Sequence, residues 1–349
     1  MAEAVLMKCN EAMGEAAIRA GANFFAGYPI TPSSEMLEYL SRRLPEEGRS
    51  FIQAESEVSA AAMVQAAALA GGRAMTVTSG PGFSLMAETL NNLAMIRVCA
   101  LFIDVQRSAS LIFPEQSDYN YVTKSLGHNG LRGYVVAPHT VQEAVDLTYT
   151  IFDKGEELEC PVFIMTDGMM GQMEEPVILP PYKERSVPLK FTPATGCAGR
   201  EALSSRKQPA LLEKSRFDAY ADYCRWEKEE VLYEEYLMDD AEYVITAYGT
   251  SARICKDTVN MMRSKGYKVG LFRPITLFPF PKYQIAEFGK RKIRAVLSVE
   301  MAMPPMFYED VRYALGPDVP VKFYNRCGGN MVDEYEAEDA MLELIGEVG

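Results

Sequence analysis

The first half of the chain alternates short apolar runs with longer segments of helical period, and this alternation constrains the fold most strongly. Five apolar runs predict strands, at residues 23–29, 73–80, 98–106, 133–138 and 161–168. Segments of ten or more residues between most of these runs predict helices, among them the alanine-rich SEVSAAAMVQAAALAGG. Strands that are apolar throughout are buried on both faces, and helical crossovers make them parallel. We therefore expect an α/β fold built on a doubly wound parallel sheet.

The second half begins with an irregular segment and continues as a smaller α/β unit. Residues 177–215 are rich in Pro, Ser, Lys and Arg without a sustained period, which is typical of a linker or wrapping arm. The run EKEEVLYEEYLMDD (227–240) predicts an exposed helix. Further strands are predicted at residues 242–249, 267–274, 292–300 and 319–325. The chain is thus expected to divide into domains at 1–178 and 239–349, with an arm and helix over 179–238.

Composition excludes several classes of function. The net charge of −13 disfavours nucleic acid and anionic membranes as partners. The seven cysteines include no C-x-x-C pair, so neither an iron–sulfur ligand run nor a zinc knuckle is expected, and the scattered thiols suit a reducing cytosol. No apolar run reaches the roughly 18 residues of a membrane span. We expect a soluble cytoplasmic protein with no metal site of its own.

The stretch GYPITPSSE (27–35) leads from a predicted strand into a predicted helix. We expect Thr31 to be the N-cap, Pro32 to occupy the first helical position and Glu35 to lie in the first turn. A helix start of this kind presents free amides and a hydroxyl, which also suit a small carboxylate.

A carboxylate opens the alanine-rich helix. Glu57 stands at its start, where small neighbours allow another backbone or a flat ring to approach closely and would leave the carboxylate partly desolvated. The alternative is that Glu57 only complements the helix dipole, since acids are common in first turns. Glu55, two residues earlier in the sequence, is the alternative candidate for any role assigned to Glu57.

Two more strand-to-helix turns carry candidate binding groups. TVTSGPGFSL (76–85) exposes amides around a Gly-Pro-Gly turn, a weak signal for an anion or a polar ring edge. Arg107 follows an apolar strand and suits bidentate recognition of a carboxylate, although a structural ion pair fits equally well. His128, in a polar loop, is a possible cleft residue, whereas His139 is expected to be structural because it lies beside a helix cap.

Taken together, these turns resemble the α subunit of 2-oxoacid:ferredoxin oxidoreductases, which use thiamine diphosphate. The pair YPITPSS and TSGPGFSLM is specific, and PEQSDY, YGTSAR, GLFRPITLFPFP and VLSVEM extend the match over nearly the whole chain. The branched-chain (3-methyl-2-oxobutanoate) type is the nearest, and the 2-oxoglutarate type shares most motifs. The resemblance implies a pyrimidine-binding domain of the thiamine-diphosphate fold followed by a transketolase C-terminal-like domain.

The resemblance also implies roles for single residues. Glu57 matches the acid that hydrogen-bonds the aminopyrimidine ring nitrogen of the cofactor. Thr31 and Arg107 match the positions that hold the 2-oxoacid carboxylate. The residues that match the cofactor-binding positions are Tyr28, Pro29, Ser79, Gly80 and Gly82. Where the family usually carries a Gly- and Pro-rich loop, this chain has SASLIF (108–113), which would line the substrate pocket.

The family chemistry needs groups that this sequence lacks. There is no GDG-plus-Asn motif for Mg²⁺ and the diphosphate, and there are no cluster cysteines for electrons. The resemblance therefore implies a thiamine-diphosphate-binding β subunit, a γ subunit and a ferredoxin-like subunit with [4Fe-4S] clusters. Coenzyme A would be the co-substrate and ferredoxin the acceptor. A non-catalytic scaffold and a nucleotide-binding Rossmann protein are the alternatives, and the second lacks the G-x-G-x-x-G spacing.

Overall fold

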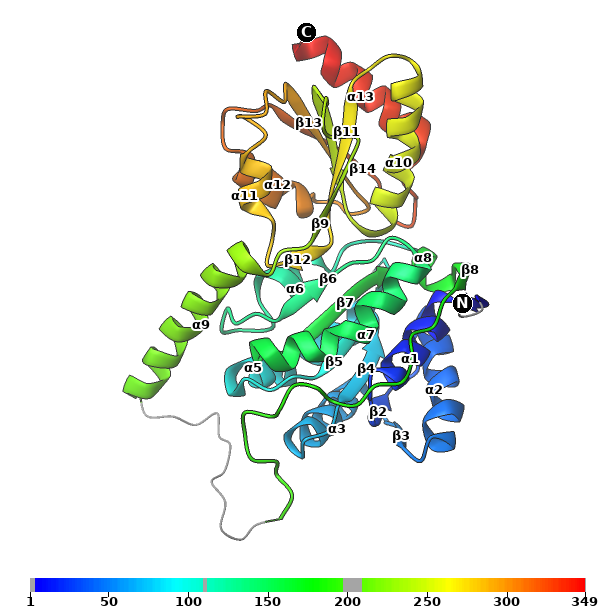
Figure 1. The fold of residues 1–349 in the computed structure, drawn as a ribbon, viewed down its shortest axis with the longest axis vertical. Helices are drawn as coiled ribbons and strands as arrows, with labels where there is room; N and C mark the ends of the chain where they lie inside the picture. The colour runs from blue at the N-terminus through cyan, green and yellow to red at the C-terminus, as the bar shows by residue number, and fades with distance from the viewer. Residues whose placement is uncertain (1–3, 109–111, 197–208, 349) are drawn as a thin grey trace.

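The computed structural model describes residues 4–108, 112–196 and 209–348, which form two α/β units joined end to end (Figure 1). The larger sheet has the order β12-β6-β7-β5-β4-β2-β3. Its strands are β2 (Phe24–Gly27), β3 (Ser50–Gln53), β4 (Ala74–Thr78), β5 (Leu101–Gln106), β6 (Tyr134–Val136), β7 (Val162–Asp167) and β12 (Thr276–Phe278). All pairs are parallel except β12 with β6.

Helices enclose this sheet. They are α1 (Cys9–Arg19), α2 (Ser34–Glu46), α3 (Glu57–Leu69), α4 (Gly80–Leu85), α5 (Ala87–Ile96), α6 (Tyr119–Lys124), α7 (Val141–Leu158) and α8 (Gly168–Gln172). Helix α1 packs against α2 and α7, and α3 packs against α5. Every residue of β4, β5 and β7 is buried, as expected for strands covered on both faces. A short antiparallel pair, β1 (Val5–Lys8) with β8 (Glu174–Val177), lies beside α1 and α7.

The second sheet has the order β14-β13-β10-β11-β9. Its elements are β9 (Tyr233–Tyr236), β10 (Tyr243–Ala247), α10 (Gly249–Ser264), β11 (Val269–Pro274), α11 (Lys282–Ala286), β13 (Ala295–Glu300), α12 (Phe307–Leu315), β14 (Val321–Asn325) and α13 (Glu334–Val348). Helix α9 (Pro209–Glu229) precedes it and runs along the outside of the first domain (Figure 1). No helix of the described ranges is long and apolar enough to cross a bilayer.

The prediction of an exposed helix over residues 227–240 is wrong. Helix α9 ends at Glu229, and four residues of the expected helix instead form β9, antiparallel to β11. Tyr233 stacks on Phe272 with ring centroids 5.2 Å apart, and Glu234 accepts a hydrogen bond of 2.8 Å from the buried Arg273. These tertiary contacts override the local charge pattern that suggested an exposed helix.

Gln116 joins the two domains. Its backbone N–H donates to the Met301 carbonyl over 2.6 Å, and its side-chain oxygen accepts from Met301 N (2.9 Å) and from Ser251 Oγ (2.7 Å). Its amide nitrogen donates to the carbonyl of Tyr248 over 3.1 Å. Gln116 is only 1 % exposed. If its side chain were removed, its hydrogen-bond partners would have no water molecule to bond to instead.

We predict that Gln116→Leu lowers the free energy of unfolding by about 2–4 kcal/mol, because two buried donors and one buried acceptor lose their partner. The drop is measured as a lower midpoint of urea unfolding. Gln65→Leu in α3 is the matched control, since among the described residues that half-buried glutamine has no side-chain hydrogen bond. Equal midpoints for the two variants would show that Gln116 does not stabilise the junction.

Candidate active site

Four neighbouring strand ends form the candidate site. Strands β5, β4, β2 and β3 lie side by side and parallel, so their carboxyl ends meet at one edge of the sheet. This edge is where open α/β sheets bind ligands. The stretches that follow these strands are Arg107 onward, the Ser79–Gly82 turn, Tyr28–Thr31 and the segment leading to Glu57.

Glu57 is the buried acid of this edge. It is the first residue of α3, after the N-cap Ser56, whose side chain accepts a hydrogen bond of 3.2 Å from Ser59 N. The Glu57 side chain is 7 % exposed and lies against Gly82. A Cβ atom placed on Gly82 would come within 2.7 Å of Glu57 Oε1 and 2.3 Å of Thr78 Oγ1. Only glycine at position 82 therefore leaves room for this carboxyl.

Glu55 occupies a different environment. It is exposed and accepts a hydrogen bond from Ser59 Oγ, which lowers the pKa of its carboxyl below the usual range. The structure thus separates the two acids: Glu57 faces the glycine turn and Glu55 faces solvent.

Thr31 and Arg107, the two residues expected to hold the substrate carboxylate, lie in contact with each other. Arg107 Nη1 donates to the Thr31 carbonyl over 3.0 Å, and its Nε has no hydrogen-bond partner in the described part of the chain. No carboxylate of the described residues forms an ion pair with Arg107, so the structural ion pair considered above is absent there. The guanidinium keeps donors for a ligand.

The expected helix start at Thr31 and Pro32 is wrong by two residues. Helix α2 begins at Ser34, and residues 30–33 form a turn in which Ser33 N and Oγ both donate to the Ile30 carbonyl, over 3.0 and 2.8 Å. The Thr31–Pro32 peptide is cis. Asn10 of α1 donates to the Pro32 carbonyl over 2.9 Å and fixes the turn from a distant part of the sequence. Thr31 is exposed beside Arg107 rather than capping the helix.

The remaining predicted cofactor residues surround the same edge. Ser79 is buried, and its hydroxyl has no partner among the described residues; the same is true of the Thr78 hydroxyl. Gly80 lies against Asp118, whose carboxyl oxygens would be 2.9 and 3.0 Å from a Cβ at that position. Tyr28 and Pro29 are exposed at the end of β2.

His128, the possible cleft residue, lies outside the candidate site at the strand ends. Its ring is exposed, with Nδ1 3.8 Å from Glu88 Oε2 of α5, and no hydrogen bond links it to the described residues of the strand-end site. His139 is structural, as expected. Its Nδ1 lies 2.7 Å from Glu143 Oε2, and its Nε2 lies 3.0 Å from Lys256 Nζ.

Sequence reasoning missed a pair of buried acids below the glycine turn. Asp104, on β5, is completely buried, and neither of its carboxyl oxygens has a hydrogen-bond partner among the described residues. The second acid, Asp118, directly precedes α6. Burial and the neighbouring acid raise the pKa of Asp104 well above its usual value, and burial raises the pKa of Asp118 to about 6. The available signal was an aspartate in the apolar run LFIDVQ, since an unpaired charge is rarely buried in a strand.

The loop at 108–113 is only partly described. Residues 109–111 lie outside the described residues, but Ser108 N donates to the Phe113 carbonyl over 3.0 Å, and Arg107 and Pro114 form an isolated bridge. The side chains of Ile112 and Phe113 are exposed.

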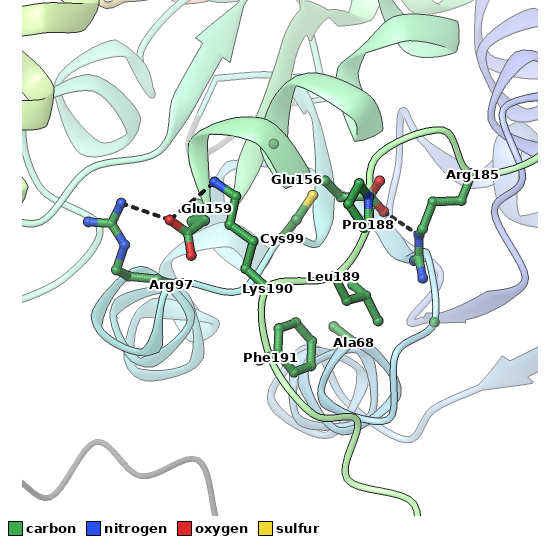
Figure 2. A pocket seen from close by; sticks show the side chains of 12 residues that line it. Ala68, Arg97, Cys99, Glu156, Glu159, Arg185, Pro188, Leu189, Lys190 and Phe191 are labelled. Carbon is green, nitrogen blue, oxygen red and sulfur yellow. Dashed lines mark hydrogen bonds and ion pairs between the residues drawn. The ribbon is translucent and has the colours of Figure 1, made fainter.

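A pocket between the arm and α7 does not belong to this edge. Figure 2 shows Arg185 reaching Glu156, and Arg97 and Lys190 both reaching Glu159. Each of the three cations that line this pocket is therefore ion-paired with one of its two acids, and the pairs made by Arg185 and Lys190 fasten the arm to the first domain.

The site residues fit the cofactor that the sequence resemblance implied. A buried carboxyl at Glu57 suits a ring nitrogen, and the unpartnered hydroxyls of Thr78 and Ser79 are buried groups with hydrogen bonds still to be made.

Comparisons with known proteins identify the family and the fold of the chain. Residues 15–233 match the family described as pyruvate flavodoxin/ferredoxin oxidoreductase, thiamine-diphosphate-binding, and residues 241–337 match pyruvate:ferredoxin oxidoreductase core domain II. The fold is also that of a 2-oxoglutarate:ferredoxin oxidoreductase from Magnetococcus marinus, with a TM-score of 0.86 and 24% identity over 99% of this chain and 66% of that one. A split-gene transketolase aligns with a TM-score of 0.58 and 14% identity over 98% of this chain and 99% of that one. The expected fold class is confirmed.

Two relatives are similar over almost their entire length. The ketoisovalerate oxidoreductase subunit VorB of Methanothermobacter thermautotrophicus is 42% identical, with 98% of each chain covered. The 2-oxoglutarate synthase subunit KorA of Methanocaldococcus jannaschii is 33% identical over 96% of this chain and 98% of the relative. The chain therefore belongs to the 2-oxoacid:ferredoxin oxidoreductases and is an oxidoreductase subunit with a thiamine-diphosphate-binding domain.

Proposed function

We propose that this chain is the α subunit that binds the pyrimidine end of thiamine diphosphate and the carboxylate of a branched-chain 2-oxoacid. The observation that carries the proposal is the buried carboxyl of Glu57 against Gly82, on the same sheet edge as the Thr31–Arg107 pair. The complex would convert the 2-oxoacid and coenzyme A into acyl-CoA and carbon dioxide while ferredoxin is reduced.

Each group of the site has a chemical task in this proposal. The bound cofactor would supply the carbanion that attacks the keto carbon and later accepts the electrons left by decarboxylation. Glu57 would hold a proton at its carboxyl for the pyrimidine ring nitrogen, where exclusion of water strengthens the hydrogen bond. Arg107 would bind the substrate carboxylate through its unused donors, and the exposed Thr31 hydroxyl would add one more. These contacts with the carboxylate would hold the keto carbon of the substrate beside the cofactor.

The missing functions are assigned to partner subunits. We propose a β subunit that holds Mg²⁺ and the diphosphate, a γ subunit and a ferredoxin-like subunit with [4Fe-4S] clusters. Support comes from the sequence, which contains neither a GDG-plus-Asn motif nor cluster cysteines. No group of three or more His, Cys, Asp or Glu side chains in the described ranges is arranged to hold a metal ion. We place the complex in the cytoplasm, which suits the scattered free thiols.

Two observations favour a branched-chain substrate. The relative at 42% identity is named a ketoisovalerate oxidoreductase subunit, whereas the 2-oxoglutarate synthase subunit is 33% identical. The exposed side chains of Ile112 and Phe113 follow Arg107 on a loop whose ends are bridged, and they offer apolar surface to an aliphatic side chain. A second carboxylate, as in 2-oxoglutarate, would have to be desolvated against that surface.

For the assembled complex, we predict that 3-methyl-2-oxobutanoate has a kcat/KM at least about tenfold higher than 2-oxoglutarate, since apolar contacts of this size contribute about 1–3 kcal/mol. The measurement is reduction of viologen with coenzyme A present. A preference for 2-oxoglutarate would assign the chain to the alternative type, and inactivity with every common 2-oxoacid would favour a non-catalytic scaffold.

Glu57→Gln is predicted to reduce turnover of the assembled complex by roughly 10²–10⁴-fold, because the amide cannot transfer the proton. Glu55→Gln, which alters an exposed carboxyl two residues away, is the matched control and should retain activity. Both variants are compared in viologen reduction after assembly has been verified by size-exclusion chromatography. Unchanged turnover in Glu57→Gln would mean that Glu57 only complements its helix.

A further inference from the structure

A loop of the second domain, RCGGN (residues 326–330), packs against the segment that follows Arg107. Gly329 of this loop lies between β14 and α13, and a Cβ atom on it would be 2.4 Å from Phe113 Cβ and 2.8 Å from Phe113 Cγ. Carbon atoms that are not bonded to each other pack about 3.5–4.0 Å apart. The Phe113 side chain can therefore keep its position only because residue 329 has no side chain.

The backbone of Phe113 is tied to the end of β5. Ser108 N, directly after Arg107, donates to the Phe113 carbonyl over 3.0 Å. The neighbouring residues Arg107 and Pro114 form the isolated antiparallel bridge. The contact with Gly329 is thus made by a residue whose backbone is bonded beside the proposed carboxylate-binding arginine.

The RCGGN loop has a defined conformation of its own. Gly328 and Gly329 have φ angles of +66° and +85°, which glycine adopts without steric cost. Asn330 donates to the Cys327 carbonyl twice, from its backbone N–H over 3.3 Å and from its Nδ2 over 2.9 Å. These two bonds close the turn that presents Gly329 to Phe113.

The end of β13 connects both partners of this contact. Arg326 N, at the start of the RCGGN loop, donates to the carbonyl of Glu300, the last residue of β13, over 3.2 Å. The next residue, Met301, exchanges two backbone and side-chain hydrogen bonds with Gln116. Gln116 follows Phe113 by three residues. The second domain therefore holds the RCGGN loop and the segment around Phe113 from the same strand end.

We propose that Gly329 is a positioning residue that sets the selectivity of the site for the side chain of the 2-oxoacid. The inference rests on the proposed branched-chain substrate. Phe113 is 51 % and Ile112 57 % exposed, so the apolar surface offered to an aliphatic side chain includes a ring that Gly329 holds in place. A side chain at position 329 would displace that ring by roughly an ångström and misplace this surface.

The test is the ratio of kcat/KM for 3-methyl-2-oxobutanoate to kcat/KM for 2-oxobutanoate, measured as viologen reduction by the assembled complex. The two substrates share the carboxylate and keto groups and differ by one methyl group, which an apolar pocket discriminates by about tenfold or more. A ratio measured on one preparation does not depend on the fraction of folded enzyme, so a purely structural loss leaves it unchanged. We expect Gly329→Ala to lower the ratio at least about fivefold.

Gly328→Ala is the matched control. Alanine is strained at both positions because both φ angles are positive, but a Cβ atom on Gly328 would meet no other atom within 4 Å. This variant should therefore keep the wild-type ratio. Phe113→Ala, which introduces no backbone strain, should lower the ratio as Gly329→Ala does.

The possible outcomes separate this inference from the proposed function. Equal ratios in Gly329→Ala and Gly328→Ala, or a wild-type ratio in Phe113→Ala, would overturn the inference and leave the proposed function intact. A wild-type complex that does not distinguish the two substrates would refute the branched-chain assignment itself, and the inference with it.

Discussion

The close approach of Glu57 to Gly82 is the constraint on which the candidate site depends. The starts of α3 and α4 can meet only because position 82 has no side chain, and the Glu57 carboxyl fills the space that a Cβ would need. Burial of that carboxyl follows from the contact, since the glycine turn covers it. A carboxyl in such surroundings interacts more strongly with a hydrogen-bonding ligand than one in water. The sheet edge is thus organised around an acid rather than an apolar cluster.

A layer of buried polar groups continues from this acid to the second domain. The unpartnered hydroxyls of Thr78 and Ser79, the Asp104–Asp118 pair and Gln116 lie at or just beyond the carboxyl ends of β4 and β5. Gln116 then binds the backbone of the second domain, so the edge that carries the site also holds the domain junction. Buried polar groups cost stability unless they are satisfied, and their concentration here is characteristic of functional sites rather than structural cores.

The local sequence pattern predicted the structure correctly where it depended on a single strand or helix. The apolar runs predicted β4 and β5 because their burial is uniform, and Glu57 became a candidate because it opens the alanine-rich helix. The failures required contacts from distant residues. The turn at residues 30–33 is fixed by Asn10, and β9 exists because it pairs with β11. The buried acids Asp104 and Asp118 come from a strand and from a helix start, and no local pattern records their proximity.

The central claim, that Glu57 supplies the proton which activates the cofactor, is tested most directly by proton exchange rather than by turnover. The measurement is the rate at which the thiazolium C2 proton of bound thiamine diphosphate exchanges with deuterated solvent in the assembled complex without substrate. The account predicts that Glu57→Gln slows this exchange by at least about 100-fold, while Glu55→Gln leaves it unchanged. Equal exchange rates in Glu57→Gln and the wild type would contradict the account.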